Sequence, residues 1–265
     1  MNLTIEQKKE KVKDLRPIDD VFFEVLAANK LVCQEILRTI MEDPKLLVED
    51  VIVQSSERNI YGRSVRLDAL CVLGDGKRVN IEVQRSDNDN HLKRVRYNSA
   101  SITVHDSAAG DDFSDIPDVY VVYISEFDFL KEGKTIYHVD KVLRETGTVI
   151  DDGAHAIFVN TAVDDGSDIA DLMSCFTKKQ VNSPKFPELS GEVTRLKDTE
   201  GGASAVCKVM QHYETIARDE GRQEGRQEGI LGTFVTLAKE GLLQISEAAK
   251  RCNMSEAEFT KLLQQ

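Results

Sequence analysis

Long hydrophobic runs are absent from this 265-residue sequence. No stretch approaches the roughly 18 apolar residues that a membrane-spanning helix needs. The opening segment, MNLTIEQKKEKVKDL, is polar and charged and lacks the apolar core of a secretory signal. We therefore expect a cytoplasmic protein without a membrane partner.

The sequence also lacks the spacings that mark disulfide frameworks and zinc sites. Its five cysteines are odd in number, widely separated and free of CxxC pairs, which predicts reduced and mostly buried thiols. Its five histidines are equally dispersed, and none lies at metal-ligand spacing from another histidine or a cysteine. This pattern argues against a histidine-based zinc site.

Positive charge is in short supply, because 34 Lys and Arg against 46 Asp and Glu give a net charge of −12. This balance argues against a polyanionic partner, since nucleic-acid affinity comes largely from cations that neutralise phosphates. One segment carries a net positive charge although the whole chain is negative. Its charged residues are Arg85, Asp87, Asp89, Lys93, Arg94 and Arg96. A local basic groove is therefore compatible with an acidic chain.

The composition that remains is that of a globular protein, with 41% hydrophobic and 30% charged residues. Apolar spacing and β-rich runs predict the following elements: helices over 18–41, 89–103 and 169–176, and strands over 48–54, 64–73, 78–84, 118–125 and 154–161. The segment SPKFPE at 183–188 marks a boundary. A mixed α/β domain over residues 1–185 follows.

After the boundary, the sequence predicts a helical linker with no strands. Residues 186–229 form a predicted helical linker that contains the repeat EGRQEGRQEG. Its glycines at 221, 225 and 229 would lie on one helical stripe, so a dimer seam is the alternative to a solvated linker. Sequence alone favours the linker.

Residues 230–265 predict a small helical tail, with two short helices around Asn253 and a capping box formed by Ser255 and Glu258. The helix-turn-helix spacing resembles a DNA-reading unit. Its charge is balanced, which favours a packing or oligomerisation appendage over a base-reading module.

Two carboxylates are conspicuous because each lies among apolar neighbours in a predicted strand. Asp68 lies in LDALCVL and Glu82 in NIEVQ. Carboxylates of this kind bind Mg²⁺, which neutralises charge on a phosphodiester and activates water. Strand side chains alternate, so Glu82 and Gln84 share one face, as do Arg66 and Asp68. Taken alone, the pattern also fits an ordinary hairpin with a polar face.

The register of the hairpin tests the carboxylate pair. If Gly74, Asp75 and Gly76 form a three-residue loop, paired positions sum to 150 and Asp68 lies opposite Glu82. A two-residue Asp75-Gly76 turn would shift the sum to 151 and send the two carboxylates to opposite faces unless a bulge restored them. A metal site therefore requires the three-residue loop or a bulge.

Several segments in order resemble the recombination-promoting nuclease and transposase family of the PD-(D/E)XK superfamily. They are IDDVFFEVLA, GRSVRLDALCVLGDGKRVNIEVQ, HLKRVRYNSASI and DIPDVYVVYISEFDF. The resemblance covers about residues 16–130 well and the rest loosely. It implies an α/β fold with a restriction-endonuclease-like mixed sheet flanked by helices, followed by a small helical C-terminal appendage.

The resemblance also implies roles for individual residues. It makes Asp68 and Glu82 metal ligands for Mg²⁺ or Mn²⁺, and it places Gln84 as a third catalytic residue where many relatives have lysine. Asp20 matches an aspartate of the first helix and is an accessory candidate. The expected DNA-binding side chains are Arg66, Arg85, Lys93, Arg94, Arg96 and Tyr97.

The sequence departs from the family pattern at two positions. Glu24 stands where the first helix usually carries a basic residue, which reverses the charge there. Gln84 has no positive charge, so it can orient a water or a phosphate oxygen only by hydrogen bonding.

We expect a metal-dependent DNA endonuclease of low sequence specificity, active in recombination or mobile-element biology. One alternative is a catalytically weak or inactive DNA-binding or interaction protein that retains the fold. Another is an oligomeric scaffold that self-associates through residues 203–265.

Overall fold

The computed structural model describes residues 5–58, 64–87, 90–110 and 112–263, without the side chains of 5, 54–58, 64–66, 220, 223 and 224. The chain divides into two compact units, Met1–Val209 and Met210–Gln265. Within the described ranges, no helix combines the length and apolar character needed to cross a bilayer.

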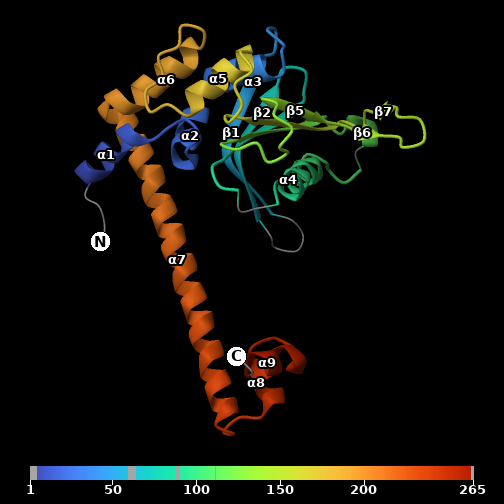
Figure 1. Cartoon of the computed structure of the whole chain (residues 1–265), viewed down its shortest axis with the longest axis vertical. Coiled ribbons are helices and arrows are strands. Elements are labelled where there is room, and N and C mark those ends of the chain that lie inside the picture. Colours follow the sequence, from blue (N-terminus) through green and yellow to red (C-terminus); the bar gives the residue numbers. More distant parts are fainter. Residues whose placement is uncertain (1–4, 59–63, 88–89, 111, 264–265) are drawn as a thin grey trace. The chain divides into compact units, whose positions relative to one another are not determined.

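The first unit is built on a six-stranded mixed sheet with the strand order β1-β2-β3-β4-β8-β5 (Figure 1). The bounds of these strands are β1 Val48–Arg58, β2 Ser64–Leu73, β3 Arg78–Gln84, β4 Val119–Ser125, β8 Ala154–Asn160 and β5 Ile136–Val139. β3, β4 and β8 run parallel, and the remaining neighbours pair antiparallel. β4, the middle strand of the parallel set, is apolar and almost fully buried, as expected for a strand covered on both faces.

Three short strands and a 3₁₀ turn were not predicted from the sequence. They are β5, β6 (Lys141–Val142), β7 (Val149–Ile150) and η1 (Phe113–Asp115). β6 and β7 form a separate two-stranded ribbon whose residues are exposed. Such short exposed runs bury no apolar face, so they leave no periodic signal in the sequence.

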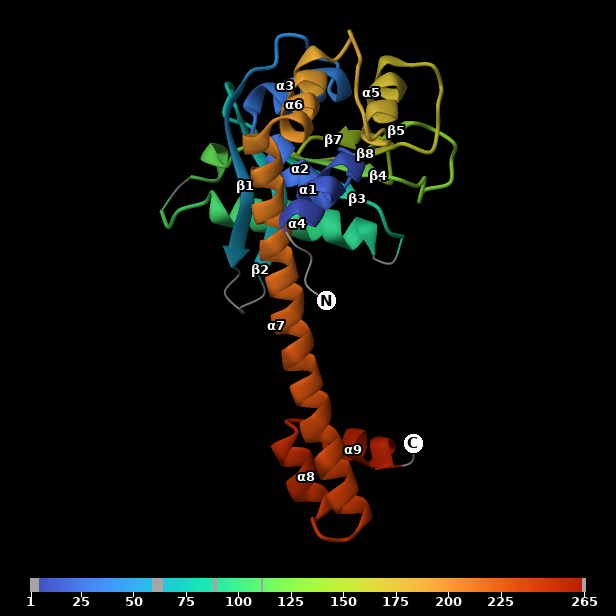
Figure 2. The ribbon, with the colours of Figure 1, turned by 90° about the vertical axis from the view of Figure 1, so that its left-hand side faces the viewer.

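Helix α4 (His91–His105) covers one face of the sheet. Its buried residues His91, Val95, Asn98 and Ile102 follow helical spacing and form one stripe. Figures 1 and 2 both show α4 on one side of the strands and α3 and α5 on the other. Side chains at even positions of β3 therefore face α4, since Arg94 contacts Glu82 and Gln84 there.

The opposite face carries α2 (Asp20–Ala27) and α3 (Lys30–Ile40). The sequence predicted one helical pattern over 18–41, and the structure has two helices there. Asn29 causes the break, because its side chain accepts a hydrogen bond from the backbone N–H of Leu31 at 3.1 Å and caps α3. Helices α5 (Asp168–Phe176) and α6 (Pro187–Asp198) pack against α3.

The first unit extends past the expected boundary at residue 185. Pro187 opens α6, at the position where a helix tolerates proline because no partner for its N–H is needed. Leu189, Val193 and Leu196 are fully buried. The carboxylate of Glu35 in α3 accepts hydrogen bonds from the first backbone N–H groups of α6. The proline-rich segment thus begins a packed helix and does not separate two domains.

Lys197 is a buried cation near the end of α6, with 4% of its surface exposed. Its ammonium group donates hydrogen bonds to the backbone carbonyls of Lys13, Leu15 and Lys179. It also lies 5.3 Å from the centroid of the Phe22 ring. One side chain therefore joins the C-terminal end of α1 (Ile5–Asp14), the segment after α5, and α6.

The second unit consists of the end of α7 (Glu200–Lys239), α8 (Ile245–Arg251) and α9 (Glu256–Leu263). Phe259, Ala248 and Ala249 form its core with side chains from α7. The predicted capping box is confirmed, because Ser255 and Glu258 exchange hydrogen bonds. The repeat at 220–229 is continuous helix, and a Cβ added at its glycines would meet nothing within 4 Å.

The cysteines are free thiols, as predicted from their spacing. Four of them are buried and one is half-buried: Cys33, Cys71, Cys175, Cys207 and Cys252.

Candidate active site

The hairpin between β2 and β3 has the register that a carboxylate pair requires. Ala69 pairs with Ile81 and Leu70 with Asn80, so paired positions sum to 150. The backbone N–H of Leu73 donates to the carbonyl of Lys77 at 3.0 Å, which closes the loop over residues 74–76. Gly76 has a φ of +87°, a conformation that glycine adopts readily. The three-residue loop is therefore the observed one, and it places Asp68 opposite Glu82.

The side chains of Asp68 and Glu82 accept backbone hydrogen bonds where the regular pairing of β2 with β3 ends. The last ladder pair toward the strand ends is Ala69 with Ile81. Beyond it, the backbone N–H of Val83 donates to Oδ2 of Asp68 at 3.0 Å. The backbone N–H of Asp68 donates to Oε1 of Glu82 at 3.3 Å. Each carboxylate is thus fixed by the backbone of the facing strand.

Burial and mutual repulsion disfavour the charged forms of both carboxyl groups. Removal from water raises the pKa of Asp68 well above its ordinary value, and the nearby charge of Glu82 raises it further. Burial also raises the pKa of Glu82, while the hydrogen bond from Asn80 and the charge of Arg94 oppose that shift. Glu82 is 1% exposed, so its charge has little access to water.

Asp20, the first residue of α2, brings a third carboxylate to this region. Its charge raises the pKa of both Asp68 and Glu82. The pKa of Asp20 is itself raised, chiefly by partial removal from water, although the residue keeps solvent contact and Arg94 opposes the shift. Three carboxyl groups therefore lie close enough to influence one another, and the accessory role of Asp20 stays a prediction.

Arg94 is the cation closest to these carboxylates in the described contacts. Its Nη1 donates a hydrogen bond to Oε1 of Gln84 at 3.0 Å. Its Nη2 lies 3.7 Å from Oε2 of Glu82. Gln84 in turn donates from Nε2 to the backbone carbonyl of Ser86 at 2.9 Å. The amide of Gln84 therefore orients Arg94 toward Glu82.

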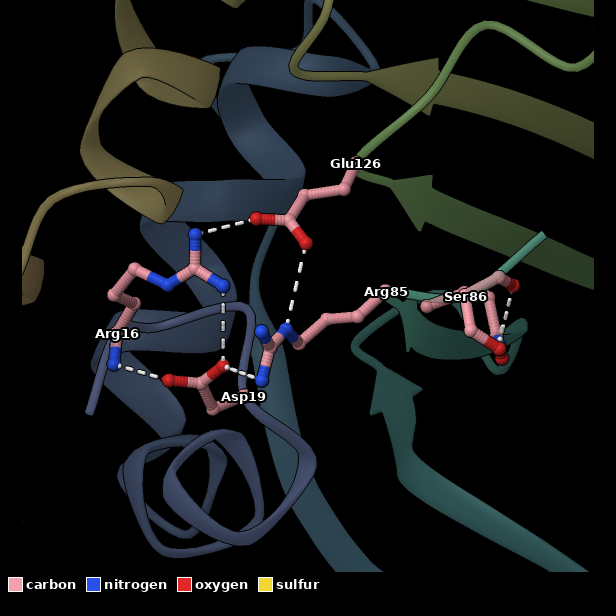
Figure 3. A network of polar contacts seen from close by, with 6 residues as sticks. Arg16, Asp19, Arg85, Ser86 and Glu126 are labelled. Carbon is pink, nitrogen blue, oxygen red and sulfur yellow. Dashed lines mark hydrogen bonds and ion pairs between the residues drawn. The ribbon is translucent and has the colours of Figure 1, made fainter.

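A separate ion-pair network includes Asp19 and Arg85, the chain neighbours of Asp20 and Gln84 (Figure 3). Arg16 and Arg85 each contact both Asp19 and Glu126. Asp19 also accepts a hydrogen bond from the backbone N–H of Arg16 at 2.6 Å, so its side chain makes no capping bond to α2. Two cations and two anions cancel, which reduces the positive charge that Arg85 can offer to DNA.

The other expected DNA-binding side chains lie in different environments. Lys93 is exposed near the start of α4. Arg96 is also exposed, but it lines a groove between α4 and β8. Tyr97 packs against the buried cluster of Leu67 and Ile102, which favours a core role over base stacking. The side chain of Arg66 lies outside the described residues.

Some residues of the site were missed from the sequence. Asn80 lies two residues before Glu82 on the same face, and its Nδ2 donates to Oε1 of Glu82 at 2.8 Å; strand alternation could have identified it. Arg16 and Glu126 are 110 residues apart in the chain and carry no local signal of their pairing.

The carboxylates fit a hard divalent cation. Mg²⁺ needs only one or two protein carboxylates when water and phosphate complete its shell. Oε2 of Glu82 is buried and has no hydrogen-bond partner among the described residues, although Arg94 lies nearby. A cation would also relieve the repulsion between Asp68 and Glu82. In the part of the chain that the structure describes, no group of three or more His, Cys, Asp or Glu residues is arranged as a metal site.

Comparison with known protein families gives one match. The model of the PD-(D/E)XK nuclease family transposase matches residues 17–162, which is more than half of the chain. Asp20, Asp68, Glu82, Gln84 and Arg94 all lie within this range. No curated protein and no solved structure matches the chain significantly.

Proposed function

Because the chain belongs to the PD-(D/E)XK nuclease family transposases, we propose that it is a Mg²⁺- or Mn²⁺-dependent DNA endonuclease with Asp68, Glu82 and Gln84 as its catalytic residues. The family and the restriction-endonuclease-like mixed sheet expected from the sequence are confirmed. A nuclease function in general follows from the family. Metal dependence, the cleavage mode and the residue roles are the proposed part.

The pairing of half-buried Asp68 with buried Glu82 supports the metal site most directly. Placing two mutually repelling carboxylates together in a hairpin disfavours their charged forms, and a structural role alone gives no reason for that arrangement. Each carboxylate uses one oxygen to accept backbone or amide hydrogen bonds. Their other oxygens are therefore the expected ligand atoms, with Asp20 as an accessory group.

A bound divalent cation would supply positive charge to the phosphodiester and lower the pKa of an attacking water. The chain's own residues provide the rest of the site. Asp68 and Glu82 would hold that cation through their carboxylate oxygens. Exposed Lys93 would contact the DNA backbone, together with Arg94. Phosphate contacts of this kind carry no sequence information, so sequence specificity should be low.

The opposing observations favour a second candidate, a DNA-binding or interaction protein without turnover. Gln84 replaces a lysine of many relatives and carries no charge. Arg85 is paired with Asp19 and Glu126, and the chain as a whole has a net charge of −12. Recombination or mobile-element biology remains the proposed context for either candidate, and self-association through the C-terminal helices remains a proposal.

Plasmid cleavage in the presence of Mg²⁺ or Mn²⁺ tests the endonuclease. Asp68→Asn and Glu82→Gln should each abolish cleavage while preserving the fold. Asp75→Asn is the matched control, because Asp75 is an exposed aspartate in the loop of the same hairpin. Equal cleavage by all four proteins would reveal a contaminating nuclease. DNA binding by a wild-type protein that never cleaves would favour the second candidate.

A further inference from the structure

The proposed endonuclease site contains a neutral residue where it needs a positive charge. Negative charge grows on the phosphate oxygens during phosphodiester hydrolysis, and fixed cations stabilise it. Gln84 lies on the same face of β3 as Glu82, yet an amide can only donate or accept hydrogen bonds. Its Nε2 is already bonded to the carbonyl of Ser86. Gln84 therefore cannot supply that charge.

Arg94 brings a positive charge to the same place from a different element. It lies in α4, ten residues after Gln84, and its Nη1 donates a hydrogen bond to Oε1 of Gln84 at 3.0 Å. Its Nη2 lies 3.7 Å from Oε2 of Glu82, the oxygen expected to serve as a ligand. The guanidinium thus lies beside the carboxylate pair.

The start of α4 is held firmly enough to fix this position. Asn90 caps the helix by accepting a hydrogen bond from the backbone N–H of Lys93 at 3.1 Å. His91 is buried, with Nδ1 2.8 Å from the hydroxyl of Tyr123 and Nε2 2.8 Å from a carboxylate oxygen of Asp87. Arg94 follows one turn later, so its backbone is anchored before its side chain leaves the helix.

The guanidinium of Arg94 can also reach substrate. Its side chain is 36% exposed, whereas Glu82 beside it is 1% exposed. The side chain of Arg94 therefore contacts Glu82 and also keeps contact with solvent. Arginine presents several donors in a planar fork, so it can hold Gln84 and a phosphate oxygen at once.

We infer that Arg94, oriented by Gln84, supplies the positive charge of the proposed site, and that it binds a nonbridging oxygen of the phosphate to be cleaved. This assignment rests on the proposed endonuclease function. It makes Gln84 a positioning residue that acts through Arg94. It also gives Arg94 a different role from Lys93 and Arg96, which would contact only phosphates that are not cleaved.

Moving the charge between the two positions tests the assignment. Arg94→Gln should lower plasmid cleavage by about 100-fold or more, the loss typical of one transition-state contact. The double variant Arg94→Gln/Gln84→Lys should recover at least about tenfold of that loss, because the lysine restores a cation from β3. A double variant no better than Arg94→Gln would overturn the assignment. Arg144→Gln, which removes an exposed arginine of the β6–β7 loop, is the control for charge loss.

Metal affinity gives a readout that does not depend on cleavage. Calorimetry with Mn²⁺ alone should show about three- to tenfold tighter binding to Arg94→Gln, since a cation that competes for Glu82 has been removed. Arg144→Gln should bind Mn²⁺ as the wild type does. A purely structural arginine predicts equal or weaker binding after its removal, and that result would contradict the assignment.

The failure of the assignment can be told apart from the failure of the proposed function. If the wild type cleaves DNA and Arg94→Gln cleaves equally well, only the role of Arg94 is overturned. If the wild type does not cleave under any metal, the endonuclease itself is overturned, and the assignment to Arg94 fails with it. Circular dichroism and thermal melting of each variant exclude unfolding as the cause of a loss.

Discussion

The backbone N–H of Asp68 donates a hydrogen bond to Oε1 of Glu82 at 3.3 Å. The strand that carries one carboxylate therefore orients the other. In the same way, Asp68 accepts a hydrogen bond from the backbone of β3, at Val83. Because these bonds replace the ladder at the end of the hairpin, the geometry of the proposed metal ligands depends directly on the register of β2 and β3.

Asp68→Asn should stabilise the metal-free protein. The asparagine carbonyl can still accept from Val83, while a charge partly removed from water and its repulsion with Glu82 are lost. We expect a melting temperature at least about 3 °C higher at pH 8 in EDTA, since about 1 kcal/mol raises it by roughly 2–4 °C in a domain of this size. Differential scanning calorimetry measures the shift.

The gain should depend on pH in a defined direction. The folded-state pKa of Asp68 lies above the ordinary value of 3.8. Between the ordinary pKa and the folded-state pKa, the folded wild type binds more protons than the unfolded chain. The wild type therefore loses stability as the pH rises through that range. Asparagine does not titrate, so the advantage of the variant should grow from pH 4 upward. A constant or shrinking difference would contradict burial and repulsion as the cause.

Glu126→Gln should increase DNA affinity. Glu126 pairs with both Arg16 and Arg85, so its neutralisation leaves one unit of positive charge unbalanced beside the site. Binding to a short duplex in Ca²⁺ should tighten about three- to tenfold, and the salt dependence should steepen by about one phosphate contact. Glu132→Gln makes the same charge change on an exposed loop residue and should change affinity less. Equal effects would mean that only net charge matters.

Lys197→Met should destabilise the first unit strongly. The methionine keeps most of the aliphatic volume but leaves the carbonyls of Lys13, Leu15 and Lys179 without their donor. Each buried carbonyl that loses its partner costs about 1–3 kcal/mol. We expect a loss of at least about 2 kcal/mol in urea unfolding. Lys208→Met, at an exposed position, should lose little; a similar loss at both positions would contradict a specific role for Lys197.

Phe259→Ala should unfold the second unit and spare the first. Phe259 is fully buried in the small core of that unit, and such truncations cost about 3–5 kcal/mol. Limited proteolysis should then cut α8 and α9, while plasmid cleavage by the first unit persists. Light scattering on the same variant tests self-association: an unchanged mass would rule out a dimer that needs the folded tail.

Much of the sheet and the central carboxylate pair could be predicted from the sequence. The loop Gly74-Asp75-Gly76 limited the register to two choices, and strand alternation then placed Asp68 opposite Glu82 in one of them. These predictions succeeded because strand period and turn chemistry are local properties. The assignment of metal-binding roles to the pair came from the family resemblance and stays a prediction.

The surroundings of the pair could not be predicted in the same way. The contact of Arg94 with Gln84 depends on how α4 is rotated against the sheet, which three-dimensional packing decides. The pairing of Arg16 with Glu126 depends on two loops meeting at the strand ends. The segment around Pro187 suggests a domain boundary in the sequence, because a proline can mark either the start or the end of a helix.

Two backbone amides at the end of the β2–β3 hairpin can report whether the proposed metal site is occupied. The backbone N–H groups of Val83 and Asp68 each donate to a carboxylate oxygen of a proposed ligand, Asp68 and Glu82 respectively. Any occupant that draws these carboxylates toward itself must lengthen those bonds, and hydrogen–deuterium exchange at the two amides would then speed up locally. An occupant that uses only the other oxygens would slow the exchange. The exchange rates of these two amides therefore show, without any substrate, whether the carboxylate oxygens bind the backbone or the occupant.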